Sequence, residues 1–418
     1  MPKKFWHSKD FEKFAHGNLF ISATLFLSST GVSLLVAIIV ISFFGWDNYG
    51  SLITVLTFSF VLNQIATGGS QNQVIRINAN IPNPNLKALY RLAIRRKRRS
   101  NSLVSILILF YLIMHFLDFV EIKSFDTTPL VIILLSSIIS PNLRIRLSLF
   151  VSNERFKKYF LINLTRNLIF LLFVIISTSL QTKELLYASF LIADAIIAII
   201  LSIAFRKFTT KSENEEVSFE TSSTLHFTFI NLYHEIVPKV DLFCMIFLAA
   251  PSLIGKYSIV VLLSEGMHSL YGAIRTQNTP KFSHFGVANT KLLFKDAKAY
   301  IFTSLLILSL GVVVILMLMS MNLIVLDNGL VALILLSLNS IILLMPIIYT
   351  SVLTQWNMQI LQVRLYFMHL MASVVVFVMG YKINGLIFAL VLLCLANLAF
   401  AIKVYCTLIN ANPYRAKL

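Results

Sequence analysis

The residues best suited to chemistry lie where an apolar chain should tolerate them least, in the segment YHEIVPKVDLFCM at 233–245. Glu235 and Lys239 are four residues apart, in the order that favours an ion pair on one face of a helix. Pro238 has no N–H to donate, so a bend is expected there. Asp241 lies about 200° around a regular helix from Lys239, so the two cannot share a face. The segment therefore either locks two helices together or lines a polar cavity.

A polar stripe follows in SEGMHSLYGAIR, where Glu265, His268, Gly272 and Arg275 recur at intervals of three, four and three residues. This spacing puts the four residues on one face of a helix. Because the rest of the helix is apolar, the stripe is expected to face inwards. Glu265 is interpreted as a cavity group or as the partner of a neighbouring helix, and Arg275 can also extend to the lipid headgroups.

The first half of the chain adds uncharged polar and basic groups to apolar segments. NQIATGGSQNQVIR carries Asn63 and Gln64, and SPNLRIRLSLF carries Arg144 and Arg146. If this second segment is helical as far as Asn153, Arg144 lies about 13 Å from the helix end at 1.5 Å per residue. A place in a cavity and a place at the membrane interface both stay open for the two arginines.

Asp194, alone among apolar residues in LIADAIIAII, is expected to form a hydrogen bond with a neighbouring helix rather than to carry a proton. The three cysteines, Cys244, Cys394 and Cys406, match no metal-binding or disulfide spacing. Nucleotide-binding, metalloprotease and hydrolase motifs do not occur in the sequence. We therefore expect no cofactor, no metal site and no enzymatic activity.

The elements that must position these residues are membrane spans. Of the 418 residues, 57% are hydrophobic and 13% are charged, whereas soluble domains are about 45–50% apolar. About twelve apolar runs reach the roughly 20 residues that a crossing helix needs. The predicted spans are 19–43, 51–74, 102–120, 128–152, 159–180, 184–205, 225–249, 254–275, 299–321, 328–352, 358–379 and 384–408.

The net charge of +17 is concentrated in alternate loops, such as RLAIRRKRRS at 91–100 after the second predicted span. Basic loops stay on the cytoplasmic side, so both termini are expected in the cytoplasm. The same distribution explains the basic balance without nucleic acid as a partner. TQWNMQILQVR at 354–364 is expected at the cytoplasmic headgroup level, with its tryptophan and glutamines in the interface.

A polar stretch at 206–224, rich in serine, threonine and glutamate, is interpreted as a cytoplasmic linker. It divides the chain into two predicted six-helix bundles, 1–205 and 225–418, as in transporters built from repeats. The fold class is therefore all-α, a polytopic membrane protein of about twelve helices. Faint internal similarity joins NYGSLITVL near the start of the second span to GKYSIVVLL near the start of the eighth.

The long segment from VDLFCM to TPKFS at 240–283, together with FFGWDNYGSL at 43–52, resembles polysaccharide exporters of the multidrug/oligosaccharidyl-lipid/polysaccharide (MOP) superfamily. The resemblance implies a V-shaped pair of six-helix bundles. Its Wzx-type members would flip undecaprenyl-diphosphate-linked oligosaccharide across the bacterial inner membrane. The matching residues are Gly45, Tyr49, Gly50, Asp241, Gly255, Tyr257 and Pro280.

Roles for the polar residues follow from this resemblance and from their chemistry. Basic residues in a site of low dielectric attract a diphosphate, and the candidates are Arg144, Arg146, Lys239 and Arg275. Amides suit sugar hydroxyls, and the candidates are Asn63 and Gln64. Protons or sodium ions would drive transport, and the candidate coupling residues are Asp241, Glu265 and His268.

Two rival functions remain. A multidrug exporter of the same superfamily should have a cavity dominated by acidic and aromatic residues, but basic residues are at least as numerous in these spans. A membrane-embedded polysaccharide polymerase should have a large outer loop, and the predicted outer loops are short. The sequence contains only 14 glycines, which leaves the hinge positions open.

Overall fold

The computed structural model describes residues 8–67, 70, 74, 127–152, 156–208, 221–264, 313, 316, 328–355 and 358–411. Side chains are described within a smaller set, which begins at Gly31 and omits that of Glu235. Within the described residues every regular element is helical and there is no strand, as the expected all-α class requires. The elements are α1 (Ser8–Thr67), α4 (Thr127–Ser152), α5 (Phe156–Leu180), α6 (Lys183–Phe208), α7 (Thr221–Ile236), the 3₁₀ helix η1 (Val237–Lys239), α8 (Val240–Leu248), the helix Pro251–Ser264, α11 (Gly329–Gln355) and α12 (Gln359–Ala411).

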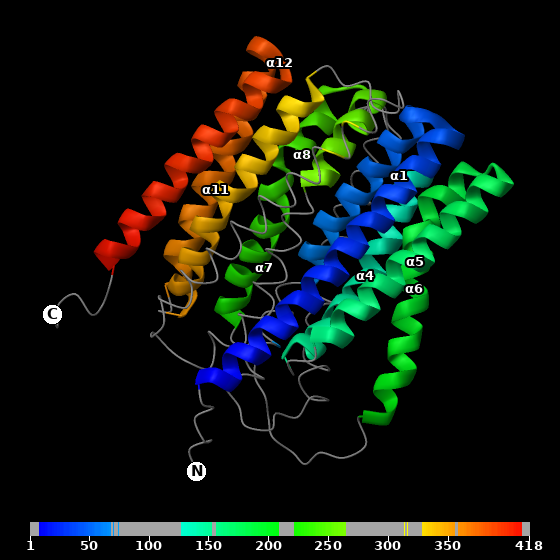
Figure 1. Cartoon of the computed structure of the whole chain (residues 1–418), viewed down its shortest axis with the longest axis horizontal. Coiled ribbons are helices and arrows are strands. Elements are labelled where there is room, and N and C mark those ends of the chain that lie inside the picture. Colours follow the sequence, from blue (N-terminus) through cyan, green and yellow to red (C-terminus); the bar gives the residue numbers. More distant parts are fainter. Residues whose placement is uncertain are drawn as a thin grey trace.

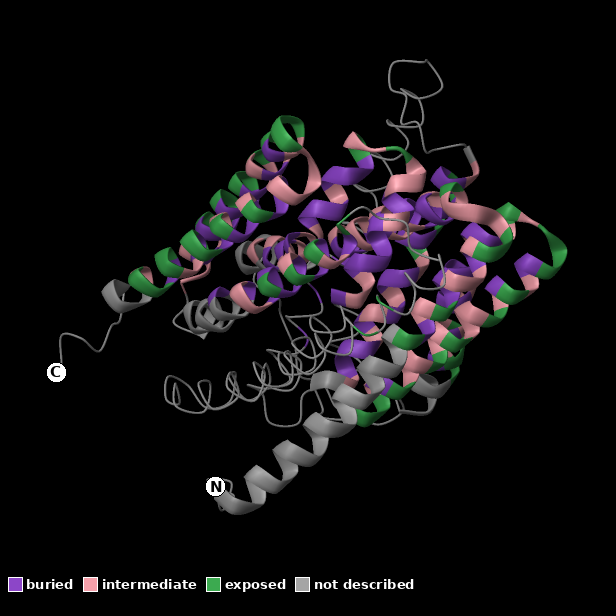
Figure 2. Ribbon diagram, turned by 45° about the horizontal axis from the view of Figure 1, so that its top comes forward, coloured by how far each residue is buried: buried purple, intermediate pink, exposed green. Residues whose placement is uncertain are grey.

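The helices are those of a polytopic membrane protein. Five of the described helices are long and apolar enough to cross a membrane. Many of their large exposed side chains are apolar, as at Leu161, Leu168, Leu172 and Ile175 along one face of α5. Figure 2 shows such exposed positions along the outward sides of the helices, with buried positions between the helices. These outward faces suit contact with lipid.

Two of the long helices are hairpins. In α1 the backbone is interrupted at Gly45, with φ 81° and ψ 176°, and in α12 at Gly385, with φ 76° and ψ −168°. Both conformations lie where only glycine is comfortable. In Figure 1 the second arm of each turns back beside the first. These two glycines therefore supply sharp bends in a chain that contains few of them.

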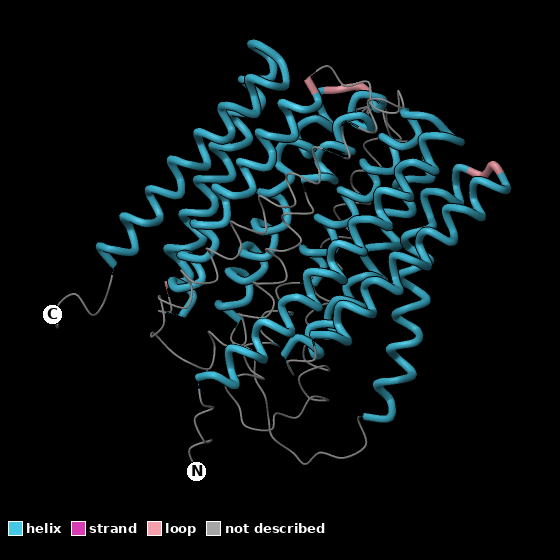
Figure 3. The backbone as a smooth tube through the Cα atoms, in the orientation of Figure 1, coloured by secondary structure: helices cyan, strands magenta, loops and turns pink. Residues whose placement is uncertain are grey.

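The arms of these hairpins match predicted spans. The predicted pair 19–43 and 51–74 lies on the two sides of the α1 bend, and the pair 358–379 and 384–408 lies within α12. The turn at 181–182 joins α5 to α6, and Figure 3 places it with the 249–250 turn at the end opposite the two termini.

The described helices form two groups. One contains α1, α4, α5 and α6, and the other contains α7, α8, α11 and α12, while α1 also packs against α7. The first group precedes the predicted linker in the sequence and the second follows it. Helices occupy both ends of the 206–224 stretch, because α6 continues to Phe208 and α7 begins at Thr221. Two complete six-helix bundles remain a prediction.

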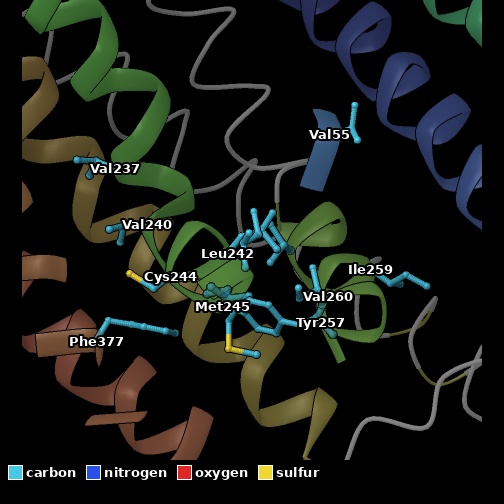
Figure 4. Close-up of a cluster of buried hydrophobic side chains, with 14 of the residues drawn as sticks. Val55, Val237, Val240, Leu242, Cys244, Met245, Tyr257, Ile259, Val260 and Phe377 are labelled. Atoms are coloured by element: carbon cyan, nitrogen blue, oxygen red, sulfur yellow. The ribbon is translucent and has the colours of Figure 1, made fainter. Parts of the chain in front are cut away.

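A buried hydrophobic cluster fills the region where these groups meet. Leu242 and Met245 of α8 lie beside Val260 of the helix Pro251–Ser264 in this cluster. Figure 4 shows Val55 of α1 on one side of the cluster and Phe377 of α12 on the other. Because side chains from both groups belong to this core, its burial from solvent holds the two groups together.

Candidate functional site

The expected bend in the 233–245 segment is present as a change of helix type. The α7 helix ends at Ile236, η1 includes Pro238, and Lys239 has φ −126° and ψ 19° before α8 begins. Proline causes this because its ring clashes with a helical carbonyl and it has no N–H to donate. The ion pair expected between Glu235 and Lys239 lies outside the described side chains.

The break directs Lys239 and Asp241 to different partners. The Tyr257 hydroxyl donates a hydrogen bond to Oδ2 of Asp241, and both side chains are buried. Lys239 instead places Nζ 5.5 Å from the ring centroid of Phe60 on α1. The two charged residues therefore do not share a face, as their spacing predicted.

Phe60 also receives a second cation. Cζ of Arg144 on α4 lies 5.2 Å from the same ring centroid, so a guanidinium and an ammonium from different groups of helices lie within 5.5 Å of one point. Each contact is a cation–π interaction. Even at their greatest possible separation of about 11 Å, the two charges would repel by about 1.5 kcal/mol at an effective dielectric constant of 20. An anion near both would relieve that repulsion.

A buried polar stripe continues from Phe60 along α1. Three buried polar residues follow Phe60 at helical spacing, namely Asn63, Gln64 and Thr67. Thr67 donates from Oγ1 to the Gln64 carbonyl over 2.7 Å. The Asn63 Oδ1 has no hydrogen-bond partner among the described residues. Because a buried amide oxygen without a partner is costly, it is suited to accept a bond from a ligand hydroxyl.

Asp194 forms the interhelical hydrogen bond that was predicted for it. Ser140 of α4 donates to Oδ2, and Nε of Arg166 of α5 forms a salt bridge with Oδ1. This carboxylate from α6 therefore connects three helices of one group, which is a structural role.

Arg146 has a different placement from Arg144. Its Nη1 donates to the carbonyl of Ala198 and to the hydroxyl of Ser202, both on α6. The guanidinium therefore contributes to the contact between α4 and α6. Arg146 therefore has structural partners on α6, whereas Arg144 lies over Phe60 beside Lys239.

Three candidate residues, Glu265, His268 and Arg275, lie outside the described residues, so their places in the site remain predictions. The cysteines behave as expected: Cys244, Cys394 and Cys406 are all free.

Sequence reasoning missed a buried network in the second group. Tyr233 OH is 2.6 Å from Nδ1 of His369, and Tyr366 OH is 3.3 Å from Nε2 of His234. The two tyrosine rings stack with centroids 3.6 Å apart and planes 4° apart. The sequence contained a signal for this network: a Tyr and a His are adjacent in α7, and another Tyr and His are three residues apart in α12.

Gln362, one of the glutamines of 354–364 that were predicted at the headgroup level, faces the inside of the protein. This side chain is 1% exposed and donates from Nε2 to the Tyr366 hydroxyl over 3.2 Å. Arg364, on the other side of the same helix, is exposed. The helical period separates the two faces, but the sequence alone does not show that one of them packs inside.

Two glycines lie in a close contact between α1 and the helix Pro251–Ser264. A Cβ atom added to Gly50 on α1 would lie 1.8 Å from the carbonyl oxygen of Pro251, and one added to Gly255 would lie 2.7 Å from that of Trp46. Small residues allow helix backbones to meet at such distances. The segments NYGSLITVL and GKYSIVVLL, which share a faint similarity, therefore contact each other.

Comparison with solved structures identifies the fold. The chain is similar to a MOP superfamily transporter from Pyrococcus furiosus whose binding pocket of reverse polarity suggests a different function, with TM-score 0.65 and 11% identity over 93% of this chain and 94% of that chain. It is also similar to an outward-facing multidrug resistance MATE family transporter of the MOP superfamily, with TM-score 0.66, 11% identity and the same coverages of 93% and 94%. A MATE transporter from Vibrio cholerae gives TM-score 0.65 and 12% identity over 95% and 98% of the two chains. No family model matches the sequence, and no curated protein matches it. The chain therefore has the fold of MOP superfamily transporters, as the resemblance implied.

Proposed function

We propose that the protein is a flippase that moves an isoprenoid-diphosphate-linked oligosaccharide from the cytoplasmic to the periplasmic leaflet of a bacterial inner membrane. Transport would proceed by alternating access, with an ion gradient as the energy source. The fold is one that transporters use. The observation that carries the proposal is the pair of cations, Arg144 and Lys239, on opposite groups of helices and over one phenylalanine ring.

A diphosphate fits this arrangement better than a cation does. Its charge would lie between a guanidinium and an ammonium, and both form strong charge-assisted hydrogen bonds with phosphate oxygens. The positive edge of the Phe60 ring would also favour an anion beside it. Because Arg144 and Lys239 belong to different groups, one bound anion would contact both groups at once.

The oligosaccharide would follow the polar stripe. Phe60 lies about 21 Å along α1 from Trp46 at 1.5 Å per residue, and the buried Asn63 and Gln64 lie further toward the end that was predicted to be cytoplasmic. Sugar hydroxyls could then bond to amides while the diphosphate stays near Phe60. The isoprenoid chain would remain in lipid.

Multidrug export is the second candidate, favoured by the MATE transporters among the structures of similar fold. A cationic drug would need a carboxylate. However, Asp194 already bonds to Arg166 and Ser140, and Asp241 accepts from Tyr257. Asp194 is therefore engaged at both carboxylate oxygens, which leaves it poorly suited to a cationic ligand.

Transport by purified protein in proteoliposomes tests the proposal. Movement of an isoprenoid-diphosphate-linked oligosaccharide between leaflets would be followed beside uptake of an amphipathic drug cation. We expect the lipid-linked sugar to move and the cation to stay. Movement of the cation alone would refute the flippase proposal and support drug export. Movement of neither would refute both functions.

Matched variants locate the site. Arg144→Gln and Lys239→Gln remove one cation each, whereas Arg364→Gln and Lys157→Gln remove an exposed arginine and an exposed lysine. Losing a bond to a charged group costs about 1.5–3 kcal/mol, so the first two variants should weaken lipid binding about 10- to 150-fold. Equal affinity in all four variants would remove the cation pair from the site.

A further inference from the structure

The buried contact between α7 and α12 is a reciprocal pair of tyrosines and histidines. Tyr233 of α7 bonds to His369 of α12, while Tyr366 of α12 bonds to His234 of α7. We call these four residues the Tyr–His clasp. His369 lies about 15 Å along α12 from Gln359 at 1.5 Å per residue, well inside the membrane span. An ionisable group at such a depth usually has a function.

Hydrogen bonds fix the protonation of the neutral clasp. Nε2 of His369 contacts Oδ1 of Asn397, while Nδ2 of Asn397 donates to Oδ1 of Asn339. Since an amide oxygen only accepts, Nε2 of His369 carries a hydrogen. Nδ1 of a neutral His369 must then accept the Tyr233 hydroxyl hydrogen. The chain of donors runs from α7 through both arms of α12 to α11.

The same surroundings also accommodate a protonated His369. Nδ1–H would donate to the Tyr233 oxygen once that hydroxyl rotates, and Nε2–H would keep its bond to Asn397. The ring of Phe400 lies parallel to the imidazole, with centroids 3.9 Å apart and planes 9° apart, so its π face stabilises a cation. Rotation of the Tyr233 hydroxyl therefore lets His369 keep both of its hydrogen bonds in either protonation state.

The clasp is connected to the candidate anion site through α7. His234 is five residues from Lys239, on the helix whose 3₁₀ break presents that lysine to Phe60. A change in the bond between α7 and α12 therefore acts on the element that holds Lys239. The titratable groups near the clasp are Tyr366 and Cys394 on α12, Tyr233 and His234 on α7, and Asp241 and Cys244 on α8, and the described side chains of α11 add none. His226 also belongs to α7 but lies about two turns before Tyr233.

We propose that the Tyr–His clasp, centred on His369, is the proton-binding site through which a pH gradient drives transport. The inference rests on the proposed function for what is transported. Proton binding at His369 turns the Tyr233 hydroxyl from donor to acceptor. The altered bond between α7 and α12 then shifts the balance between conformations of the transporter.

Transport with and without a pH gradient tests this. In proteoliposomes, a gradient of two pH units should accelerate movement of the lipid-linked sugar in the parent about fivefold or more. In His369→Gln the acceleration should vanish, while gradient-free movement persists. Tyr233→Phe keeps the stacked ring but removes the oxygen, so it should reduce the acceleration. His226→Gln makes the same substitution at an α7 histidine outside the clasp and should behave as the parent.

The outcomes separate this inference from the proposed function. If the parent moves lipid-linked sugar at the same rate with and without the gradient, the clasp is not a coupling site, although the flippase stands. If His369→Gln and Tyr233→Phe both keep the full acceleration, the proton binds elsewhere. If His369→Gln does not fold, Tyr233→Phe decides between these results.

A second measurement needs no substrate. Spin labels at Asp47→Cys and Lys382→Cys, in a protein whose own cysteines have been replaced, report the distance between exposed positions on α1 and α12. We expect the distance distribution to change between pH 5.5 and pH 8 in this parent and in His226→Gln, but not in His369→Gln. A change of equal size in His369→Gln, or no change in the parent, would overturn the inference even if no lipid-linked sugar moved.

Discussion

Gly50→Ala tests how the two groups of helices meet. A Cβ at position 50 would lie 1.8 Å from the carbonyl oxygen of Pro251, whereas ordinary contact begins at 3.4 Å. Because a backbone carbonyl cannot rotate away as a flexible side chain can, α1 and the helix Pro251–Ser264 must separate by about 1.6 Å. The substitution therefore acts against the joined arrangement of the two groups.

The size of the effect follows from the contact. Overpacking of this kind costs about 1–3 kcal/mol, which lowers the population of the joined state relative to a separated one by about 5- to 150-fold. Gly255→Ala should have a smaller effect, because its Cβ would lie 2.7 Å from the Trp46 carbonyl. Gly31→Ala should have none, since nothing in the described structure lies within 4 Å of its Cβ.

The assay combines distance and transport. With the same two labels on α1 and α12, Gly50→Ala should shift the distance distribution toward longer values and slow the movement of lipid-linked sugar. Gly255→Ala should show a smaller shift, and Gly31→Ala the distribution of the parent. If Gly50→Ala matches Gly31→Ala in both measurements, the backbone contact does not govern the conformation, and the reasoning from its geometry is refuted.

Three further substitutions test other parts of the structure. Asp194→Asn leaves Arg166 without its ion pair and should lower the free energy of unfolding by about 3 kcal/mol. The melting temperature should fall in this variant but not in Asp47→Asn, which changes an exposed carboxylate. Pro238→Ala should restore regular helix through η1 and turn Lys239 from Phe60, so binding of lipid-linked sugar should weaken while melting is unchanged. Asn63→Ala should reduce the affinity for lipid-linked sugar but not for the isoprenoid diphosphate alone, and equal losses for both ligands would place Asn63 away from the sugar.

Features decided by the local chain were predictable. The apolar runs gave the α4, α5 and α6 spans because length and hydropathy decide which segments cross a bilayer. Pro238 predicted the break between α7 and α8, because its ring and missing N–H act within its own helix. The burial of Asn63 and Gln64 followed from helical spacing, since one polar face on an apolar helix must turn inwards.

Partners across the fold were not predictable. Arg144 and Arg146 are two residues apart with the same chemistry, but one lies over Phe60 and the other bonds to α6. The bond between Tyr233 and His369 joins positions 136 residues apart. Helical period gives the face on which a residue lies, but packing decides what covers that face, and sequence spacing contains no information about rotation of one helix against another.

The second arm of α1 connects the close approach of the two groups with the candidate site. Gly50 meets the helix Pro251–Ser264, and Phe60, ten residues later on continuous helix, lies under Arg144 and Lys239. A helix transmits displacement over this length of about 15 Å without absorbing it, because its hydrogen bonds resist bending where no proline or glycine interrupts them. Separation at Gly50 must therefore tilt Phe60 relative to Lys239. An anion that holds Arg144 and Lys239 together would oppose this separation, and its release would allow it, so binding and opening would be linked by one rigid element.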